Sequence, residues 1–249
     1  MSSSISPKDQ KILWGRSSGR CAFKSCRKNL IHNKTEKDSE SLIGEMAHIK
    51  GEKQTAARYD SQLGLSACNE YENLILLCRD HHKLVDDQYN EYTVEKLYEM
   101  KKEHESWVDE CLKGEITNVT FAELEVITKY LNSNQPQTPE SFVVITPKDK
   151  IKKNQLSAGT EALITMGITQ ATQVRNYISN CIDSDFGERL KNEFVIKYLQ
   201  LKNDENLSGD ELFYGLLDFA SQGFTEFKEK AAGLAVLVYF FEACDIFEK

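Results

Sequence analysis

Short apolar runs separated by polar stretches characterise the first part of the chain. Residues 45–50 and 73–78 are two such runs, and each has the length of a β-strand. The second run leads directly into a helical pattern that begins at Arg79, and the polar residues 51–72 between the runs predict a long loop. The predicted order of strand, loop, strand and helix is a ββα unit.

Helical periodicity and capping residues dominate the remainder of the chain. The expected helices span residues 9–15, 94–112, 120–132, 169–182, 185–201, 208–221 and 225–243. Three of them begin with the capping-box pattern: Thr120 with Glu123, Asp185 with Glu188, and Ser208 with Glu211. The fold class is therefore α+β, with the strands near the N-terminus and a mostly α-helical part after them.

The last expected helix differs from the others because residues 231–241 are apolar on every face. A helix of that composition is either the centre of a bundle or an interface. Ahead of the C-terminal helices, polar residues 132–140 hold two of the four prolines and predict a linker, and residues 142–145 form one short strand at most. These later helices carry no catalytic constellation, so we expect them to bind partners or assemble.

The composition is that of an ordinary globular protein of 249 residues, with 40% hydrophobic and 28% charged residues. No apolar run approaches the roughly 20 residues that a membrane span needs, and the N-terminal residues lack the apolar core of a signal peptide. These features predict a cytoplasmic protein that does not engage a membrane. In such a reducing compartment, seven cysteines favour metal binding over disulfides.

The net charge of −8 hides an asymmetry along the chain. Residues 1–58 hold 12 Lys and Arg against 6 Asp and Glu, a net charge of +6, whereas the remaining residues hold 19 against 33, a net charge of −14. Eight basic residues around the first predicted strand could contact phosphates or simply form a solvated face. They are Arg16, Arg20, Lys24, Arg27, Lys28, Lys50, Lys53 and Arg58.

Two pairs of metal-ligating residues flank the ββα unit. Cys21 and Cys26 lie in a predicted turn, and Cys78 and His81 lie where the second strand meets its helix. Four such ligands close a tetrahedral zinc site without an open position, so its role would be structural. The alternative is that these cysteines are small buried apolar residues. The chemistry-bearing residues beside the second pair favour the zinc site.

Three further residues can carry chemistry. His48 lies on the first predicted strand, Asn73 starts the second, and His82 lies in the first turn of the helix. Together they supply a base, an orienting amide and a metal ligand, a set suited to phosphodiester hydrolysis with one bound metal. His104, which lies among Lys and Glu residues, is expected at the surface.

These residues resemble a known family. Cys-x4-Cys, Ala-His-Ile and Asn-Leu-Ile-Leu-Leu-Cys-x2-His-His, within residues 13–107, look like an HNH endonuclease domain, the ββα-metal fold with an added zinc knuckle. The resemblance implies that His48 activates water as general base, that Asn73 holds the His48 loop and orients the imidazole, and that His82 binds the catalytic Mg2+ or Mn2+. It also implies that the two Cys and His pairs bind Zn2+ and that cleaved DNA carries a 5′ phosphate.

One position departs from the family pattern. Many members place an Asp or His directly before the base as a second metal ligand, and this chain has Ala47 there. Glu45, Asn73 or a residue of the loop could take that role. Mg2+ keeps several of its waters, so it needs few protein ligands besides His82.

Residues 186–249 resemble a second family. Gly-Asp-Glu-Leu-Phe at 209–213 and the apolar segment that begins at Val236 look like the C-terminal domain of effectors in bacterial ABC-three-component defence systems, similar to Lamassu. The resemblance implies an antiviral effector that an SMC-like ATPase and a small middle component restrain until phage infection. The alternative is a generic helical oligomerisation domain.

The sequence therefore predicts an HNH nuclease domain at residues 1–116, a helix and linker at 117–155, and a helical assembly or partner-binding domain at 156–249. The predicted function is metal-dependent DNA cleavage in antiphage defence, controlled by the C-terminal domain, through which a homo-oligomer forms. The alternative is a zinc-stabilised module that binds nucleic acid or protein without catalysis. A zinc knuckle has no need of His48, Asn73 or His82, and this favours the enzyme.

Overall fold

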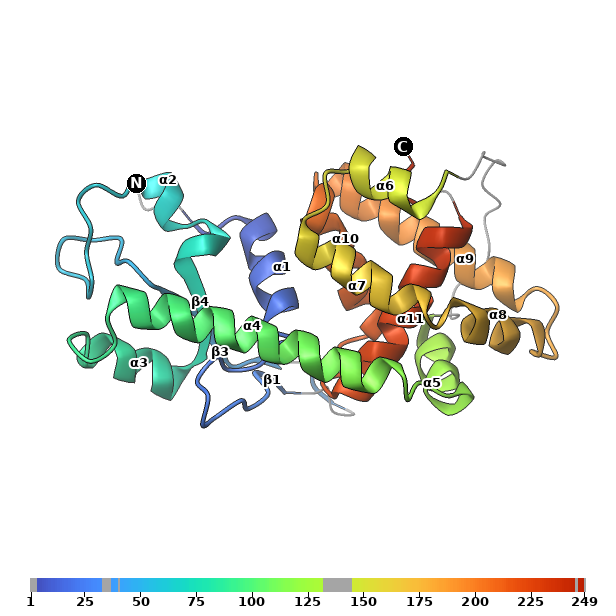
Figure 1. Ribbon diagram of the computed structural model, residues 1–249, viewed down its shortest axis with the longest axis horizontal. Coiled ribbons are helices and arrows are strands. Elements are labelled where there is room, and N and C mark those ends of the chain that lie inside the picture. The colour runs from blue at the N-terminus through green and yellow to red at the C-terminus, as the bar shows by residue number, and fades with distance from the viewer. Residues whose placement is uncertain (1–3, 33–36, 40, 132–144, 245, 249) are drawn as a thin grey trace. The chain divides into compact units, whose positions relative to one another are not determined.

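The computed structural model describes residues 4–32, 37–39, 41–131, 145–244 and 246–248. The chain divides into two compact units, Met1–Asp109 (unit 1) and Glu110–Lys249 (unit 2), and Figure 1 traces both. The linker predicted at residues 132–140 lies outside the described residues, and so do residues 142–144 of the predicted short strand.

Unit 1 combines short strands with helices. In chain order these are α1 (Pro7–Arg16), β1 (Ile31–His32), β2 (Ser41–Leu42), β3 (Gly44–His48), α2 (Leu65–Cys68), the 3-10 helix η1 (Tyr71–Asn73), β4 (Leu74–Cys78), α3 (Arg79–Asp87) and most of α4 (Val94–Ile116). The antiparallel pair β3 and β4, followed by α3, is the predicted ββα unit. The sequence did not predict the β1 and β2 pair or the short helix α2, which interrupts the expected loop.

The core of unit 1 lies around β4. All five of its side chains are buried because α1 and α3 both pack against it. The register sets Gly44 of β3 opposite Cys78. A Cβ atom at Gly44 would lie 2.8 Å from the Trp14 ring, so glycine lets α1 approach the start of β3. The start of β3 is thereby held close to α1.

His104 of α4 is buried, so the prediction that it lies at the surface is wrong. Its Nε2 lies 3.2 Å from the Ser17 carbonyl oxygen, and its Nδ1 contacts the Arg27 guanidinium. Burial, and then the charge of Arg27, lowers the pKa of His104 to about 4. Neighbours in sequence misled the prediction, because residues three and four positions apart share a helix face, and Lys101 and Val108 are buried too.

Unit 2 contains helices and no strand within its described residues. After the end of α4 it contains α5 (Phe121–Leu131), α6 (Pro147–Lys153), α7 (Ala158–Ile168), α8 (Ala171–Ser179), α9 (Phe186–Leu199), the π-helix η2 (Gln200–Asp204), α10 (Gly209–Ser221) and α11 (Phe227–Ala243). The apolar helix α11 packs against α5, α7, α8, α9 and α10 (Figure 1). It is therefore the centre of a bundle, one of the two arrangements that its composition allowed.

Helix ends in unit 2 follow local capping chemistry. The backbone N–H of Thr120 donates to Glu123 Oε2 over 2.7 Å, and Ser208 and Glu211 form the second predicted capping box. Asp185 makes no side-chain cap, so the capping box predicted for Asp185 and Glu188 is wrong. Burial disfavours the charge of Glu123, but hydrogen bonds from Lys228 and Thr120 outweigh it and lower the pKa of Glu123 to about 2.

Buried Lys150 ties α6 to the end of α11. Its Nζ donates to the Phe241 carbonyl oxygen over 2.7 Å and to the Cys244 carbonyl oxygen, and it lies 3.2 Å from Glu248 Oε1. The last carbonyls of a helix lack partners within the helix, so a cation there supplies both hydrogen bonds and a favourable charge. Lys150 thereby closes the bundle at its C-terminal end.

The fold class predicted from the sequence, α+β with a mostly helical second part, is confirmed. The sequence missed α6 and α7, although Ser157 caps α7 by accepting from the backbone N–H of Thr160. Within the described residues, no helix has both the length and the apolar character that a membrane span requires.

Candidate active site

In the antiparallel ββα unit the end of β3 lies beside the start of β4, and α3 follows the end of β4. His48 is the last residue of β3 and lies opposite Leu74, the first residue of β4. The chain leaves β4 at Cys78 and enters α3 at once, so His82 lies one turn into that helix. Two histidines that are 34 positions apart in sequence are thereby placed on neighbouring elements.

The imidazole of His48 is held by Asn69, a residue that follows α2. His48 Nε2 lies 2.8 Å from Asn69 Oδ1, and Asn69 is buried. With the amide oxygen as acceptor, Nε2 carries the proton and Nδ1 keeps its lone pair. The arrangement fixes both the ring orientation and the tautomer of His48.

Asn73 connects the end of β3 to the loop before β4. Its Oδ1 accepts from the backbone N–H of Lys50 over 2.9 Å, and its Nδ2 donates to the carbonyl oxygens of Lys50 and Cys68 over 2.9 and 2.8 Å. Asn73 thus ties the backbone just after His48 to the end of α2. The imidazole itself donates its hydrogen bond to Asn69.

His82 lies between two carboxylates. Its Nδ1 is 2.7 Å from Glu45 Oε2 on β3, and its Nε2 is 3.4 Å from Asp86 Oδ2, one turn further along α3. The interaction with the Asp86 carboxylate raises the pKa of His82 most, burial opposes it, and Glu45 raises it further. Both ring nitrogens therefore face negative oxygens, the surroundings that also suit a metal ion.

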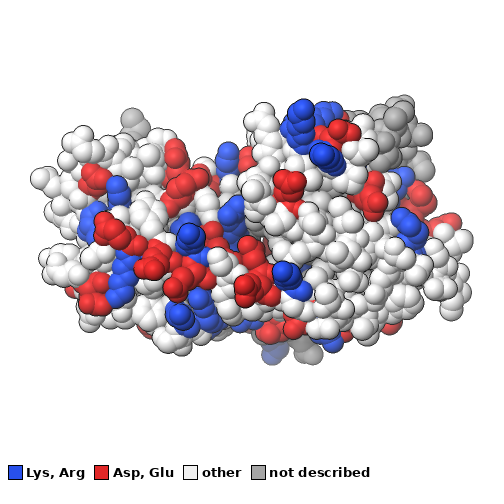
Figure 2. All heavy atoms as spheres, in the orientation of Figure 1, with Lys and Arg blue, Asp and Glu red and all other residues white. Residues whose placement is uncertain are grey.

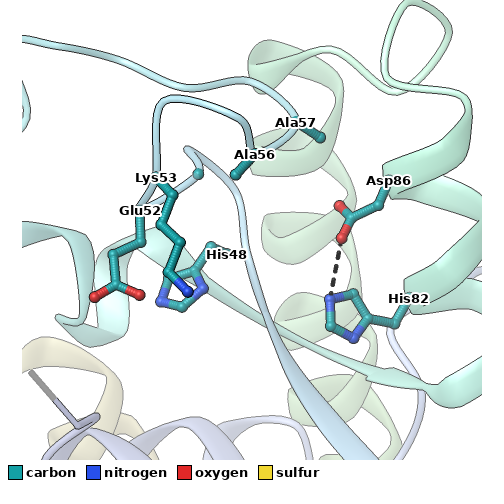
Figure 3. A pocket seen from close by; sticks show the side chains of 8 residues that line it. His48, Glu52, Lys53, Ala56, Ala57, His82 and Asp86 are labelled. Carbon is teal, nitrogen blue, oxygen red and sulfur yellow. Dashed lines mark ion pairs between the residues drawn. The ribbon is translucent and has the colours of Figure 1, made fainter. Parts of the chain in front are cut away.

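His48 and His82 line the same cavity. It has a volume of about 150 Å3 and is also lined by Gly51, Glu52, Lys53, Ala56, Ala57 and Asp86. Figure 3 shows His48, Glu52 and Lys53 on one side of the opening and His82 with Asp86 on the other. The space between the two histidines can accept a small charged group.

The loop at residues 51–58 forms one wall of this cavity and is closed at its base. The backbone N–H of Gly51 donates to the Arg58 carbonyl oxygen over 3.2 Å. A Cβ atom on Gly51 would lie 2.4 Å from the Ala57 carbonyl oxygen, so only glycine allows this close return of the chain. Lys53 and Glu52 are therefore carried on a turn of fixed width.

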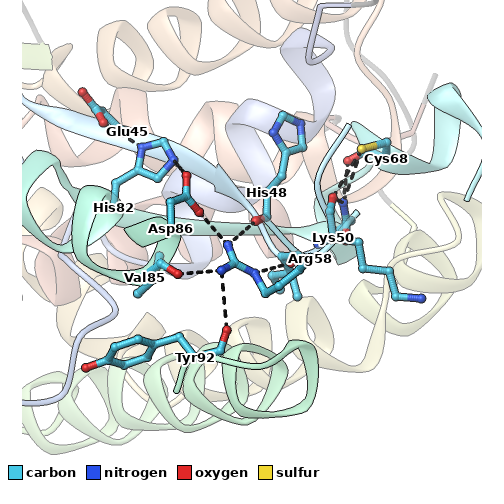
Figure 4. Close-up of polar contacts among 11 residues, drawn as sticks. Glu45, His48, Lys50, Arg58, Cys68, His82, Val85, Asp86 and Tyr92 are labelled. Atoms are coloured by element: carbon cyan, nitrogen blue, oxygen red, sulfur yellow. Dashed lines mark hydrogen bonds and ion pairs between the residues drawn. The ribbon is translucent and has the colours of Figure 1, made fainter. Parts of the chain in front are cut away.

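Arg58 joins the loop, the strand end and α3, as Figure 4 shows. Its guanidinium donates to the carbonyl oxygens of Ile49 over 2.8 Å and Val85 over 2.6 Å, and to Asp86 Oδ1 over 2.6 Å. Its side chain is only 4% exposed. Arg58 is therefore a structural residue that orients Asp86, and the expectation that it could contact phosphates is wrong.

Some of the other basic residues near β3 are also engaged within the protein, and others are exposed. Arg27 lies over the Trp107 ring, 4.7 Å from its centre, and Arg16 pairs with Glu105 at 3.6 Å. Lys53 lines the cavity and is exposed. On the visible face of unit 1, acidic and basic side chains are intermingled (Figure 2), so this face has no single sign of charge.

Four predicted metal ligands converge on one point. One ligand atom from each of Cys21, Cys26, Cys78 and His81 lies within 4.8 Å of all the others. His81 Nδ1 is 3.6 Å from Cys21 Sγ and 3.1 Å from Cys78 Sγ. A tetrahedral zinc ion with Zn–S of about 2.3 Å and Zn–N of about 2.0 Å separates its S and N ligands by about 3.5 Å.

The surroundings of this cluster also fit a cation. The Phe23 ring stacks on His81 with the ring centres 3.9 Å apart, which fixes the imidazole, and the backbone N–H of Cys78 donates to Cys21 Sγ over 3.3 Å. Burial raises the pKa of the Cys21 thiol to about 12. A bound metal ion would supply the positive charge that a thiolate needs at this buried position.

Sequence reasoning missed three residues of this region: Asn69, Arg58 as a structural residue, and Asp86. Asp86 left a signal, because an acidic residue four positions after His82 shares its helix face. The sequence gives no signal for Asn69, because its partner His48 lies 21 positions away across an irregular loop.

Comparisons with known families agree with both resemblances. The family described as HNH endonuclease matches residues 21–89, which include every metal-ligating and catalytic candidate. The family described as C-terminal domain 10 of the ABC-three component (ABC-3C) systems matches residues 122–248. This second match starts well before residue 186, where the resemblance seen in the sequence began. No curated protein matches the chain.

The second match covers just over half of the chain, and the first adds the nuclease segment ahead of it. The chain therefore belongs to the family of C-terminal domain 10 of the ABC-three component systems and carries an HNH endonuclease domain in front of it.

Proposed function

We propose that the protein is a metal-dependent endonuclease that hydrolyses DNA phosphodiester bonds. The observation that supports this most is the shared cavity of His48 and His82, within the segment that matches HNH endonucleases. Hydrolysis of a phosphodiester needs a base for the attacking water and a positive group near the leaving oxygen. His48 can supply the base, and His82 can hold the positive group, a metal ion.

In the proposed reaction His48 is the general base. Its Nδ1 lone pair takes a proton from the attacking water while Asn69 holds the opposite side of the ring. A divalent ion held by His82, Mg2+ or Mn2+, would stabilise negative charge on the phosphorane and on the departing 3′ oxygen. Lys53 lies on the cavity wall, where its ammonium can bind a phosphate oxygen.

We also propose Zn2+ as the ion of the Cys and His cluster. Three sulfur ligands and one imidazole suit zinc better than magnesium or manganese. The four ligands leave no open coordination position, so this ion would fix the start of α3 and take no part in the hydrolysis.

The decisive test is plasmid cleavage with Mg2+ or Mn2+ by the wild type, His48→Ala and His32→Ala. We expect His48→Ala to lose about 10^2- to 10^4-fold in rate, the usual contribution of one general base. His32→Ala is the control, because His32 is exposed on β1. Equal cleavage by His48→Ala would remove the assignment, and a wild type that binds DNA without cutting it would support the non-catalytic alternative.

We further propose that this nuclease is the effector of a bacterial antiphage defence system and that it acts in the cytoplasm. Unit 2 would bind the other components, an SMC-like ATPase and a small middle component, and would join copies of the chain. The match to a C-terminal domain of multi-component systems supports this role. A single HNH site cuts one strand, so a homo-oligomer would bring together the two sites that a double-strand break needs.

Self-association can be measured on the full chain by sedimentation over a range of concentrations. Val238 and Phe241 are fully buried in unit 2, so charged substitutions there would test folding and not assembly. Ile196 and Leu199 are 45% and 39% exposed on α9 and suit the test better. A chain that stays monomeric at every concentration would contradict the homo-oligomer.

A further inference from the structure

The two contacts of His82 differ in length. The 2.7 Å between Nδ1 and Glu45 Oε2 is that of a normal charge-assisted hydrogen bond. The 3.4 Å between Nε2 and Asp86 Oδ2 is longer than a good N–H to O hydrogen bond. Adjacent ligands of an octahedral Mg2+ with bonds of about 2.1 Å lie about 3 Å apart, so the second spacing has room for an ion.

Asp86 also lies on the correct side of the histidine. His82 and Asp86 are one helical turn apart on α3 and both line the cavity that contains His48, whereas Glu45 is not among the lining residues. Arg58 holds Asp86 Oδ1 at 2.6 Å. The other carboxylate oxygen, Oδ2, is thereby directed toward His82.

We infer that Asp86 is the second protein ligand of the divalent ion at His82, and that Glu45 is an outer carboxylate that orients the imidazole. The inference rests on the proposed function. Asp86 would take the place of the ligand that Ala47 cannot provide. By accepting the proton of Nδ1, Glu45 leaves the Nε2 lone pair for the metal. Asn73 is unsuited to the role, because its amide is occupied by Lys50 and Cys68.

The experiment is Mn2+ binding to the full-length, zinc-loaded protein without DNA, followed by electron paramagnetic resonance of the free ion. We expect Asp86→Asn to weaken binding by about 100-fold and Glu45→Gln by about tenfold, since Gln still accepts a hydrogen bond. Asp87→Asn is the matched control, because Asp87 is exposed on the same helix and pairs with Lys83. It should bind Mn2+ like the wild type.

A structural role for Asp86 predicts different results. Asp86→Asn keeps an oxygen for Arg58, and circular dichroism and zinc content report whether the fold is intact. Asp86→His tests ligation directly, because a histidine ligand restores binding for Ni2+ or Co2+ and favours them over Mg2+. If Asp86→His stays as weak as Asp86→Asn for Ni2+, Asp86 is not a ligand.

The remaining outcomes separate this inference from the proposed function. Normal Mn2+ binding by Asp86→Asn, a larger loss with Glu45→Gln, or a wild type that binds no Mn2+ would each overturn the inference. Plasmid cleavage is measured on the same samples. A wild type that cuts DNA while Asp86→Asn binds Mn2+ normally refutes the inference alone, whereas Asp86-dependent Mn2+ binding without any cleavage refutes the function alone.

Discussion

The interiors of the two units are stabilised by different kinds of contact. Unit 1 has a two-stranded sheet at its centre, and buried polar side chains such as Asn73, Arg58 and His104 join its loops. Unit 2 surrounds α11, whose side chains from Ala231 to Val238 are all buried. A two-stranded sheet buries little apolar surface. The stability of unit 1 therefore depends on specific buried hydrogen bonds and on its metal ligands. The unit that carries the chemistry should therefore respond to metal and pH, and the other to packing.

The largest expected effect is the loss of metal from unit 1. Cys21→Ser should release zinc and unfold much of this unit, because metal binding to a structural site contributes about 10 kcal/mol to folding. Unit 2 should remain folded. Hydrogen exchange measured separately for the two units, together with metal analysis, checks both statements.

Cys111→Ser is the control for this substitution, since Cys111 lies on α4 outside the cluster. A wild type purified without zinc, or equal exchange protection in unit 1 of Cys21→Ser, would show that the knuckle does not stabilise the fold.

Lys150→Met should instead destabilise unit 2 and leave unit 1 unchanged. Removal of the ammonium takes the cation away from the Glu248 carboxylate and from the carbonyl oxygens of Phe241 and Cys244. Breaking a buried ion pair from one side costs about 3 to 5 kcal/mol. Chemical denaturation should show this loss in unit 2, with zinc content and exchange of unit 1 unchanged.

Lys152→Met is the matched control, because Lys152 is exposed on the same helix. If both variants had the same stability as the wild type, the connection between α6 and the end of α11 would be unimportant.

A smaller effect should separate the units by pH. The pKa of His104 is about 4 in the folded chain and 6.5 ordinarily, so below pH 6.5 the unfolded chain binds a proton that the folded chain does not. Unit 1 should lose up to about 3 kcal/mol of stability as the pH falls from 6.5 to 4. In unit 2, Glu123 stabilises above its ordinary pKa of 4.5, and its contribution is lost only as the pH falls toward 2.

The measurement is denaturation of wild type and His104→Gln at several pH values between 7 and 4.5. Acid also displaces metal from the knuckle, so the difference between the two proteins is the relevant quantity. Glutamine can donate to Ser17 and accept from Arg27 but does not titrate. Identical pH profiles would mean that His104 is not the responsible group.

The parts of this molecule that sequence reasoning predicted are those with a local signal. Short apolar runs predicted β3 and β4, capping residues predicted α5 and α10, and ligand spacing predicted the four residues that meet within 4.8 Å. Each of these depends on a few neighbouring residues. The roles of His48, Asn73 and His82 stay predictions until they are tested by substitution.

The parts that were missed depend on contacts between distant segments. Asn69 meets His48 only because α2 folds back toward the end of β3, and Arg58 is buried only because α3 and the loop close around it. Helix α7 was missed because its Gly, Thr and Ile residues have weak helical preference, which packing against α11 overrides. Such contacts depend on tertiary packing, which cannot be predicted from one segment of the sequence.

The closed base of the loop at residues 51–58 has a consequence for altering the cavity that it borders. Since the Gly51 and Arg58 backbones are joined and Arg58 is fixed to α3, the ends of the loop stay in place whatever its tip contains. Doubling the length of a flexible loop costs only about 0.6 kcal/mol in closure entropy. Residues inserted beside Lys53 would therefore extend the rim of the cavity with little loss of stability, which makes this tip the natural place to change what the cavity binds.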